Sequence, residues 1–163
     1  MKTITRTKIY RPMAALILAA LAMPAAAQTQ VPFRGTFQGK DTTNYTLLTL
    51  ATAATGTGTH LGQFSFTQDV TLNFANFTDT GSAQWKAANG DIIYTTVHGS
   101  AIPGPDVFTI TEIHIITGGT GRFAGAQGSF TVHRTHVVAF SDDGTHVTFG
   151  SFDGTITSPG AAQ

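Results

Sequence analysis

Apolar and polar residues alternate along several stretches of this chain with the two-residue period of a β-strand. A half-buried strand shows this pattern because successive side chains point to opposite faces of a sheet. Between positions 63 and 72 the odd positions are polar, Gln68 is the one polar residue at an even position, and the apolar face carries Phe64, Phe66, Val70 and Leu72. After position 27, no stretch repeats apolar residues at helical spacing for more than a turn or two.

Positions 108–117 and 129–135 alternate in the same way. One face of the first stretch carries Phe108, Ile110, Glu112, His114 and Ile116. Its opposite face is threonine together with Ile113 and Ile115, so the pattern leaves both orientations open. One face of the second stretch carries Phe130, Val132 and Arg134.

We expect eight strands with turn residues between most of them. The turn signals are Asp79-Thr80-Gly81, Asn89-Gly90-Asp91, Pro103-Gly104-Pro105, Gly118-Gly119 and Asp142-Asp143-Gly144. Segment 51–60 is low in bulky side chains and predicts a flexible loop. The expected strands are 33–39, 45–51, 62–73, 82–88, 91–99, 106–117, 121–136 and 145–157.

Strands at this spacing predict an all-β fold, either a sandwich or a closed barrel. A single eight-stranded antiparallel closed barrel is favoured, because closure removes the exposed edge strands that a chain rich in Thr and Phe would have to protect. We expect this domain to cover residues 28–163, with residues 158–163 as a disordered tail.

The first 27 residues have the layout of a secretory signal peptide. Four basic residues precede an apolar run over 13–23, and three alanines at 25–27 then supply small residues for cleavage. The apolar run is too short to span a bilayer as a helix, and no Cys follows that could carry a lipid anchor. We therefore expect a secreted or periplasmic protein without a membrane anchor, and the short Ala-rich run is typical of bacterial leaders.

Removal of residues 1–27 leaves an acidic chain. All nine acidic residues remain, whereas only five of the nine Lys and Arg residues do, and these five are scattered singly. An acidic surface without a basic run argues against nucleic acid and anionic membranes as partners. The absence of Cys removes thiol catalysis and thiolate metal sites, and the fold must be stabilised without disulfides.

The most distinctive stretch of the sequence is Ile116-Thr-Gly-Gly-Thr-Gly-Arg-Phe-Ala-Gly-Ala-Gln-Gly-Ser-Phe130. Gly118 and Gly119 are expected to turn the chain between two strands, because glycine adopts a positive φ without steric strain. The stretch resembles the Gly-Gly-Thr-Gly-x-Phe…Ala-x-Gly hairpin of the allene oxide cyclase and dirigent-protein barrel superfamily. A looser similarity extends to residues 108–112 and 150–156, so that the resemblance covers about half of the chain after position 27.

This resemblance implies an eight-stranded barrel, which in this superfamily is often trimeric. The chain is similar to small exported bacterial members of the superfamily. In the plant enzymes an apolar lumen shapes a reactive lipid or phenolic intermediate, and a few polar side chains steer its closure. The matched hairpin is structural in that superfamily, so no catalytic residue is carried over to this chain. A nucleotide-binding loop is disfavoured, because the third glycine, the Lys-Ser/Thr pair and the following helix are missing.

Glu112 and His114 are the candidate catalytic residues. If their face lines the lumen, they lie two residues apart in an apolar compartment and could act as acid and base on a bound ligand. A satisfied structural pair, or an outward-facing pair, is the alternative.

The candidate ligand-binding residues are Phe108, Ile110, Ile116, Phe130 and Arg134. Arg134 could bind a carboxylate head group through two parallel hydrogen bonds. Alternatively, it packs its aliphatic stem at a strand end while its charge stays in water.

We expect no metal and no cofactor. The six histidines show no distinctive ligand spacing, and His133 and His136 lie on opposite faces of an extended strand. The His-x-His followed by Glu of cupin-type barrels and the Gly-x-Ser-x-Gly elbow of serine hydrolases are both absent from the sequence.

The sequence leaves three functions open as alternatives. The first is a binding module that holds a small apolar or amphipathic ligand in its lumen. The second is a cyclase or isomerase of the allene oxide cyclase type that acts on a reactive lipid or phenolic intermediate. The third is a structural or oligomeric barrel without a ligand. A cavity of roughly 300 Å³ or more favours a ligand, and a solidly packed lumen favours the structural barrel.

Overall fold

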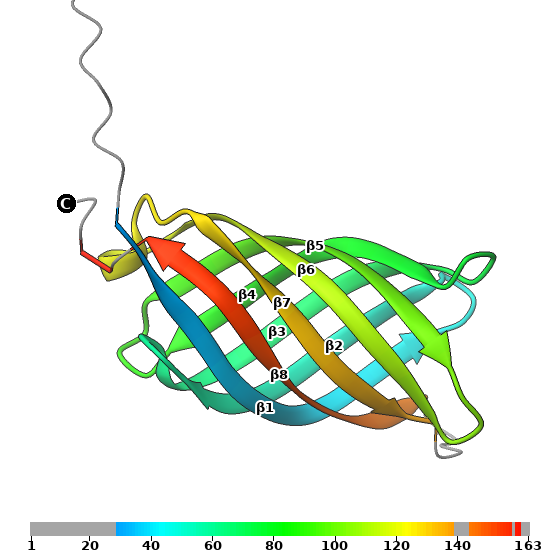
Figure 1. The fold of residues 1–163 in the computed structure, drawn as a ribbon. Coiled ribbons are helices and arrows are strands. Elements are labelled where there is room, and N and C mark those ends of the chain that lie inside the picture. The colour runs from blue at the N-terminus through cyan, green and yellow to red at the C-terminus, as the bar shows by residue number, and fades with distance from the viewer. Residues whose placement is uncertain (1–28, 139–143, 158, 161–163) are drawn as a thin grey trace, which may run out of the picture.

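The computed structural model describes residues 29–138, 144–157 and 159–160. The predicted signal peptide over 1–27, the stretch 139–143, and residues 158 and 161–163 of the predicted tail lie outside the described residues. The described part is all-β and forms a barrel of eight strands with one short 3-10 turn, η1 (Gly121–Phe123) (Figure 1).

The eight strands pair in chain order and close into an antiparallel barrel, which confirms the predicted fold class. β8 closes the barrel by pairing with β1 from Gln30↔Thr157 to Thr42↔Thr145, so the sheet has no free edge. The strands are β1 Gln30–Asn44, β2 Thr49–Gly58, β3 Gly62–Asn73, β4 Thr78–Ala87, β5 Ile92–Pro103, β6 Val107–Gly119, β7 Gly128–Val137 and β8 Thr145–Thr157.

The alternation of the sequence places every second side chain inside the barrel. The inward positions of β3 are buried up to Val70, and they include Gln68. In β6 the face with Glu112 and His114 is the buried one, whereas Ile113 and Ile115 point outward. The structure thus settles the orientation of β6, which the pattern left open.

Aromatic side chains fill one half of the barrel interior. Trp85 is fully buried, and its ring centroid lies 4.1 Å from that of Phe66, 5.2 Å from that of Phe130 and 5.0 Å from that of Phe152. Ring contacts of this kind add to the stabilisation that comes from burial itself. This half of the lumen is therefore a packed core.

Segment 51–60, which was predicted as a loop, instead forms most of strand β2. Its small residues are needed for packing, because a Cβ at Gly56 would overlap the carbonyl oxygen of Thr36 and lie 2.7 Å from the ring of Phe64. The prediction of a loop was wrong because the small side chains of this segment allow large side chains and backbone of neighbouring strands to pack closely against it. Residues 45–48, predicted to begin a strand, form the β1–β2 turn.

The Asp79-Thr80-Gly81 segment was predicted as a turn, but it lies inside strand β4. Gly81 permits a close approach of β3, because a Cβ there would overlap the carbonyl oxygen of Asp69 and lie 2.7 Å from the Cα of Val70. Asp79 consequently points inward on the same face as Trp85. The carboxylate of Asp79 is therefore buried in the lumen and does not lie in an exposed turn.

The glycine-rich connection between β6 and β7 is longer than the tight hairpin predicted at Gly118-Gly119. β6 continues to Gly119 with a register shift opposite Tyr94, and the chain turns over residues 120–127 through η1. Gly121 has a φ of +53°, which favours glycine, and the following Phe123 is fully buried in the core. β7 therefore begins at Gly128 and not near residue 121.

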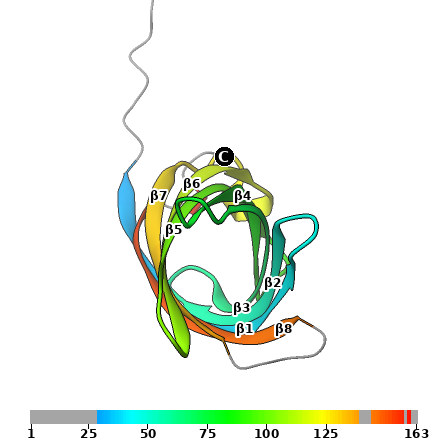
Figure 2. The same cartoon turned by 90° about the vertical axis from the view of Figure 1, so that its right-hand side faces the viewer.

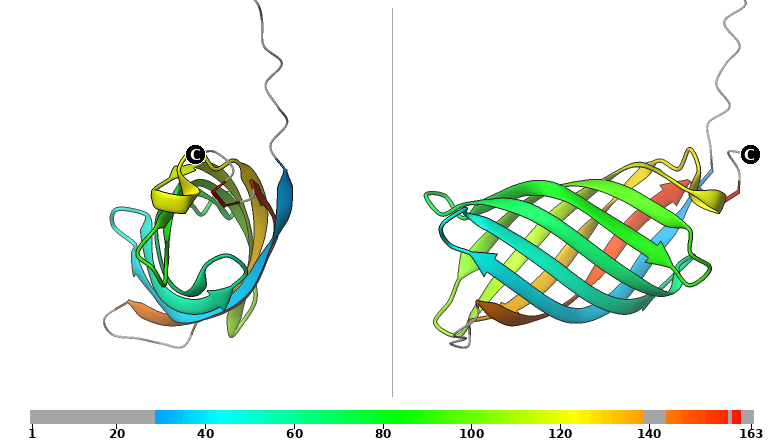
Figure 3. Two further views of the ribbon diagram at one scale, coloured as in Figure 1. Left: turned by 90° about the vertical axis from the view of Figure 1, so that its left-hand side faces the viewer. Right: turned by 180° about the vertical axis from the view of Figure 1, so that it is seen from behind.

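The two ends of the barrel differ in chemistry. At one end, which faces the viewer in the left view of Figure 3, Leu61 and Phe123 are fully buried in the core; we call it the plugged end. The opposite end, which faces the viewer in Figure 2, is formed by the β1–β2, β3–β4 and β5–β6 turns, and we call it the mouth. Among the described residues, no helix is long and apolar enough to cross a bilayer.

We predict that Gly81→Ala lowers the free energy of unfolding by about 2 kcal/mol, because the added methyl group would push β4 away from β3. Urea unfolding measures this change, with Ser82→Ala on the exposed face of β4 as the matched control. A loss below about 0.5 kcal/mol for Gly81→Ala, equal to that of the control, would contradict the close packing described for this strand.

Candidate binding site

Most of the polar side chains of the lumen gather in the half nearest the mouth. They come from the mouth-side ends of their strands, where they continue inward-facing rows that are apolar deeper in the barrel. The buried polar residues of this region are Asp41, Thr52, Gln68, Asp79, Glu112, Arg134, His136, His146 and Thr148. The interior is therefore divided into an aromatic half and a polar half.

Arg134 of β7 lies at the centre of the polar half. Its Nε donates to Oε2 of Glu112 at 2.9 Å and its Nη2 donates to Oε1 of Glu112 at 3.0 Å, which is a two-point ion pair. Its Nη1 donates to Oδ2 of Asp41 at 2.7 Å and to the hydroxyl of Thr148 at 3.4 Å. The guanidinium group thus bridges β6 and β1 across the lumen, and four of its five N–H donors are engaged.

Glu112 points into the lumen, which the sequence pattern had left open, and both of its carboxylate oxygens accept hydrogen bonds. Besides Arg134, the side-chain nitrogen of Gln68 donates to Oε1 of Glu112 at 2.6 Å. Gln68, the polar exception on the apolar face of β3, therefore helps to hold the buried carboxylate in place. A catalytic role of Glu112 stays a prediction.

Asp41 of β1 is the second counter-ion of Arg134. Its Oδ1 accepts a hydrogen bond from Thr52 at 2.7 Å, and its Oδ2 lies 2.7 Å from Nδ1 of His136. Burial acts to raise the pKa of Asp41, but the hydrogen bond with His136 and the charge of Arg134 outweigh burial and hold that pKa below its usual value. Asp41 is therefore a stable anion in the folded protein.

Asp79 of β4 differs from the other two carboxylates. It is only 6% exposed, and its Oδ1 has no hydrogen-bond partner among the described residues. Burial, together with the negative charge of Glu112, raises the pKa of Asp79 to about 7, although Arg134 partly opposes the shift. Gly99 of β5 provides the space, because a Cβ there would lie 2.6 Å from both carboxylate oxygens of Asp79 and 2.7 Å from Cγ of Glu112.

His114 lies deeper in the barrel than Glu112, among the aromatic rings. Its ring stacks on Phe130 with 5.0 Å between centroids, and its Nδ1 lies 3.0 Å from the hydroxyl of Thr95. Burial lowers the pKa of His114 to about 4, so the ring is neutral near pH 7. His114 and Glu112 share a strand face, but His114 bonds to β5 and Glu112 bonds to β3 and β7.

A cavity of about 100 Å³ opens at the mouth above this polar network. Three of the predicted ligand-binding residues, Phe108, Ile110 and Arg134, line it, whereas Ile116 and Phe130 belong to the packed aromatic half. Asp79 and His136 contribute the polar part of its floor. The cavity is far smaller than the roughly 300 Å³ expected of a pocket that encloses a drug-sized ligand, so it suits a small head group.

Aromatic rings surround the entrance of this cavity. Tyr45 of the β1–β2 turn stacks on Phe74 of the β3–β4 turn with 6.3 Å between ring centroids. Phe77 meets Phe108 of β6 edge-on at 6.4 Å. We call these four residues the aromatic rim; all four line the cavity. The site therefore has an apolar entrance and a charged floor.

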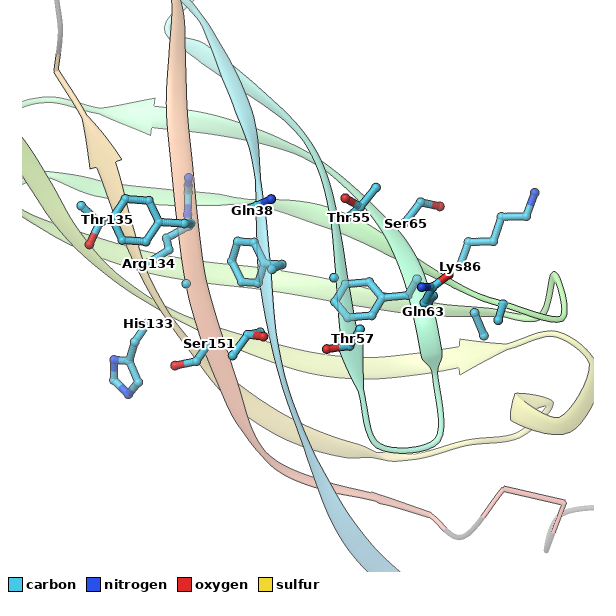
Figure 4. A pocket seen from close by; sticks show the side chains of 18 of the residues that line it. Gln38, Thr55, Thr57, Gln63, Ser65, Lys86, His133, Arg134, Thr135 and Ser151 are labelled. Atoms are coloured by element: carbon cyan, nitrogen blue, oxygen red, sulfur yellow. The ribbon is translucent and has the colours of Figure 1, made fainter.

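A larger hollow of about 1060 Å³ lies on the outer wall of the barrel (Figure 4). Its labelled side chains are mostly hydroxyl and amide groups on several strands, and Lys86 and His133 lie at opposite sides of it in the picture. Arg134 borders it too, but the guanidinium of Arg134 is bonded inside the lumen. The hollow is open, and its polar groups do not converge on a common point, so the mouth cavity is the better candidate site.

Asp41, Asp79 and His136 belong to the site although the sequence patterns did not single them out. Extending the inward alternation of β1 from Phe33 and Phe37 leads to Asp41, and extending that of β7 from Arg134 leads to His136. Asp79 was hidden by its interpretation as a turn. Among the described residues, no group of three His, Asp or Glu side chains is arranged to hold a metal ion.

Comparison with known proteins supports the fold. No protein-family model and no curated protein matches the sequence. Among solved structures, the barrel is similar to a pterocarpan synthase dirigent protein, with a TM-score of 0.54 and 10% sequence identity over 93% of this chain and 99% of that chain. The protein therefore has a dirigent-like β-barrel fold. At this identity the likeness describes the backbone and not the chemistry of the site.

We predict that Arg134→Met lowers the free energy of unfolding by about 3–5 kcal/mol, because it leaves the carboxylates of Glu112 and Asp41 buried without their shared cation. Chemical unfolding at pH 7.5 measures the loss. Lys86→Met on the exposed face of β4 removes a charge without a buried partner and serves as the control. A loss below about 1 kcal/mol for Arg134→Met would show that the network contributes little.

The shifted pKa values of Asp79 and His114 predict opposite dependences of the free energy of unfolding on pH. The folded pKa of Asp79 is about 7 against an ordinary 3.8, so its contribution to stability falls as the pH rises from about 4 to 7. The folded pKa of His114 is about 4 against an ordinary 6.5, so its contribution rises with pH from about 4 to 6.5. These two contributions largely cancel in the wild-type protein below pH 6.5.

Asp79→Asn removes the pH-dependent contribution of Asp79 to stability and leaves that of His114. Its free energy of unfolding is expected to rise between pH 4.5 and 6.5 relative to that of the wild type, with a slope difference of at most about 1.4 kcal/mol per pH unit. Urea unfolding across this range, with the exposed Asp69→Asn as control, measures the difference. Parallel pH profiles for wild type and Asp79→Asn would contradict the raised pKa of Asp79.

Proposed function

We propose that the protein is a binding module whose mouth cavity holds the head group of a small amphipathic ligand. The observation that carries this proposal is the combination of an apolar rim with a floor that contains a buried carboxylate, Asp79, whose Oδ1 has no hydrogen-bond partner in the part of the chain that the structure describes. A ligand with an apolar body and a polar end would match both parts of the cavity.

The energetics of the site support a ligand over a purely structural barrel. A buried polar group without a partner destabilises a fold by about 1–3 kcal/mol, and a buried charge by more. In the aromatic half, the same barrel fills its interior with closely packed rings. A structural barrel could have extended this packing to the mouth, whereas Asp79 and an open cavity are found there instead.

The ion pairs of Arg134 narrow the choice of ligand. Recognition of a carboxylate through two parallel hydrogen bonds requires two free N–H donors on the guanidinium group. Arg134 has at most one left, because it already bonds Glu112, Asp41 and Thr148. We therefore favour a ligand whose polar end is not a carboxylate.

A second candidate function, proton transfer to or from a bound reactive intermediate, is favoured by one observation. Asp79 borders the cavity, and its pKa of about 7 lies in the range where a carboxyl group works as acid or base. In that function, which would be of the cyclase or isomerase type, Glu112 acts indirectly by raising the pKa of Asp79. Asp79→Asn would then abolish turnover while leaving binding of the intermediate in place.

The binding proposal predicts that 2-phenylethanol, a small neutral amphipath, binds at the mouth with a dissociation constant on the order of 1 mM. Two-dimensional NMR is the measurement, with chemical-shift changes expected around Phe77, Ala101 and Phe108. Ala101→Phe should abolish these changes, because Ala101 lines the cavity and a phenyl ring there would fill it.

Ala88→Phe is the matched control, because it places the same ring in the outer hollow. It should leave the binding of 2-phenylethanol unchanged. Shifts confined to the outer hollow, or shifts that persist in Ala101→Phe, would overturn the proposal that the ligand binds at the mouth.

A further inference from the structure

We propose that the mouth cavity selects an organic cation, the ammonium group of a small amphipathic amine, over neutral and anionic ligands of the same size. This inference rests on the proposed binding function and specifies the chemistry of the ligand. It is carried by the charge of the lumen, the free carboxylate of Asp79 and the aromatic rim.

The described part of the lumen holds three carboxylates and one guanidinium group. Asp41 and Glu112 both bond to Arg134, so that they share its positive charge. Asp79 makes no ion pair and no hydrogen bond at Oδ1 within the described residues. When all three carboxyl groups are ionised, their three negative charges face the single positive charge of Arg134, and Asp79 is the carboxylate that has no ion pair among the described residues.

Asp79 lies where its unpaired negative charge can interact with a ligand in the mouth cavity. Asp79 lines the cavity, while its residue as a whole is 6% exposed, so that solvent screens its charge weakly. An ammonium group in the cavity would donate a charge-assisted hydrogen bond to this carboxylate. A neutral alcohol would provide a weaker bond, and an anion would be repelled.

The aromatic rim is the second element that favours a cation. Tyr45, Phe74, Phe77 and Phe108 surround the entrance to the carboxylate. Positive charge is attracted to the faces of aromatic rings, and rings grouped around a cation are a common means of recognising organic ammonium ions. A rim of this kind also accepts the apolar body of the amine. Rim and floor thus favour the same class of ligand.

The groups around Asp79 determine how strong this preference is. Glu112 on β6 and Asp41 on β1 add negative potential, whereas Arg134 and His136 on β7 and His146 on β8 are the opposing basic groups. Arg134 is already paired with two carboxylates, and His136 bonds to Asp41. Among the described carboxylates of the network, Asp79 is therefore the one that lines the cavity and is not already paired.

Three ligands of matched size test the inference: phenethylammonium, 2-phenylethanol and phenylacetate. Their dissociation constants are measured by NMR titration at pH 8 and low salt, where Asp79 is ionised. The expected result is that phenethylammonium binds about tenfold more tightly than 2-phenylethanol, or better, and that phenylacetate does not bind. Equal affinities for the cation and the alcohol, or a preference for phenylacetate, would overturn the inference.

Asp79→Asn tests whether Asp79 causes the preference for phenethylammonium over 2-phenylethanol, because this substitution retains the shape of the side chain and removes its charge. It should reduce the ratio of the affinity for phenethylammonium to that for 2-phenylethanol to about one. Asp69→Asn, which removes an exposed carboxylate from the outer face of β3, should keep the wild-type ratio. A preference that persists in Asp79→Asn would contradict the assignment.

A change of pH supplies a readout that a merely structural role of Asp79 would not alter. At pH 5.5 a proton occupies Asp79, so the affinity for phenethylammonium should fall about tenfold, while that for 2-phenylethanol should not change. Failure of 2-phenylethanol to bind at the mouth would refute the proposed binding function itself. Binding of the alcohol at the mouth without any preference for the cation would refute only this inference.

Discussion

The structure of the lumen depends on the interaction of Arg134 with Glu112 and Asp41. An isolated charge is expensive to bury, and a buried ion pair is tolerated only when nearly every donor and acceptor is bonded. Gln68, Thr52, Thr148 and His136 complete these bonds around the three charged groups. The network joins β1 to β6 and β7 across the interior, in addition to the backbone pairing that closes the barrel.

The fully bonded network is what makes Asp79 distinctive. Because Arg134 already pairs with Glu112 and Asp41, the carboxylate of Asp79 on β4 has no cation paired with it within the described residues. Gly81 allows β4 to approach β3 closely, and Gly99 leaves room for the carboxylate beside Glu112. The aromatic half of the barrel supplies most of the buried apolar surface, and this allows the mouth to keep a polar floor that is not optimised for packing.

The sequence predicted the parts of this structure that follow from a local period. The alternation in β3, β6 and β7 indicated strands and the side chains that share a face, and the avoidance of exposed edges favoured the closed barrel, which the structure confirms. The pattern left open which face of β6 lines the lumen, and the structure places Glu112, His114 and Arg134 inside. Prediction from local composition failed where small residues make room for side chains or backbone of a neighbouring strand. Segment 51–60 and the Asp79-Thr80-Gly81 segment have the composition of loops, but their glycines accommodate rings and backbone on neighbouring strands. The pairing of Arg134 with Asp41, 93 residues away in sequence, could not be predicted because it depends on barrel closure.

Among the described residues, the floor of the mouth holds one buried carboxylate without a bonding partner, and both binding proposals depend on it. Titration of the side-chain carboxyl carbon of Asp79 by ¹³C NMR, with and without phenethylammonium, tests this feature at the atom concerned. We expect a pKa near 7 for the free protein, and a clearly lower pKa when the cation is bound. A pKa close to 3.8 in the free protein, unaffected by the cation, would contradict the presence of an unpartnered carboxylate at the mouth.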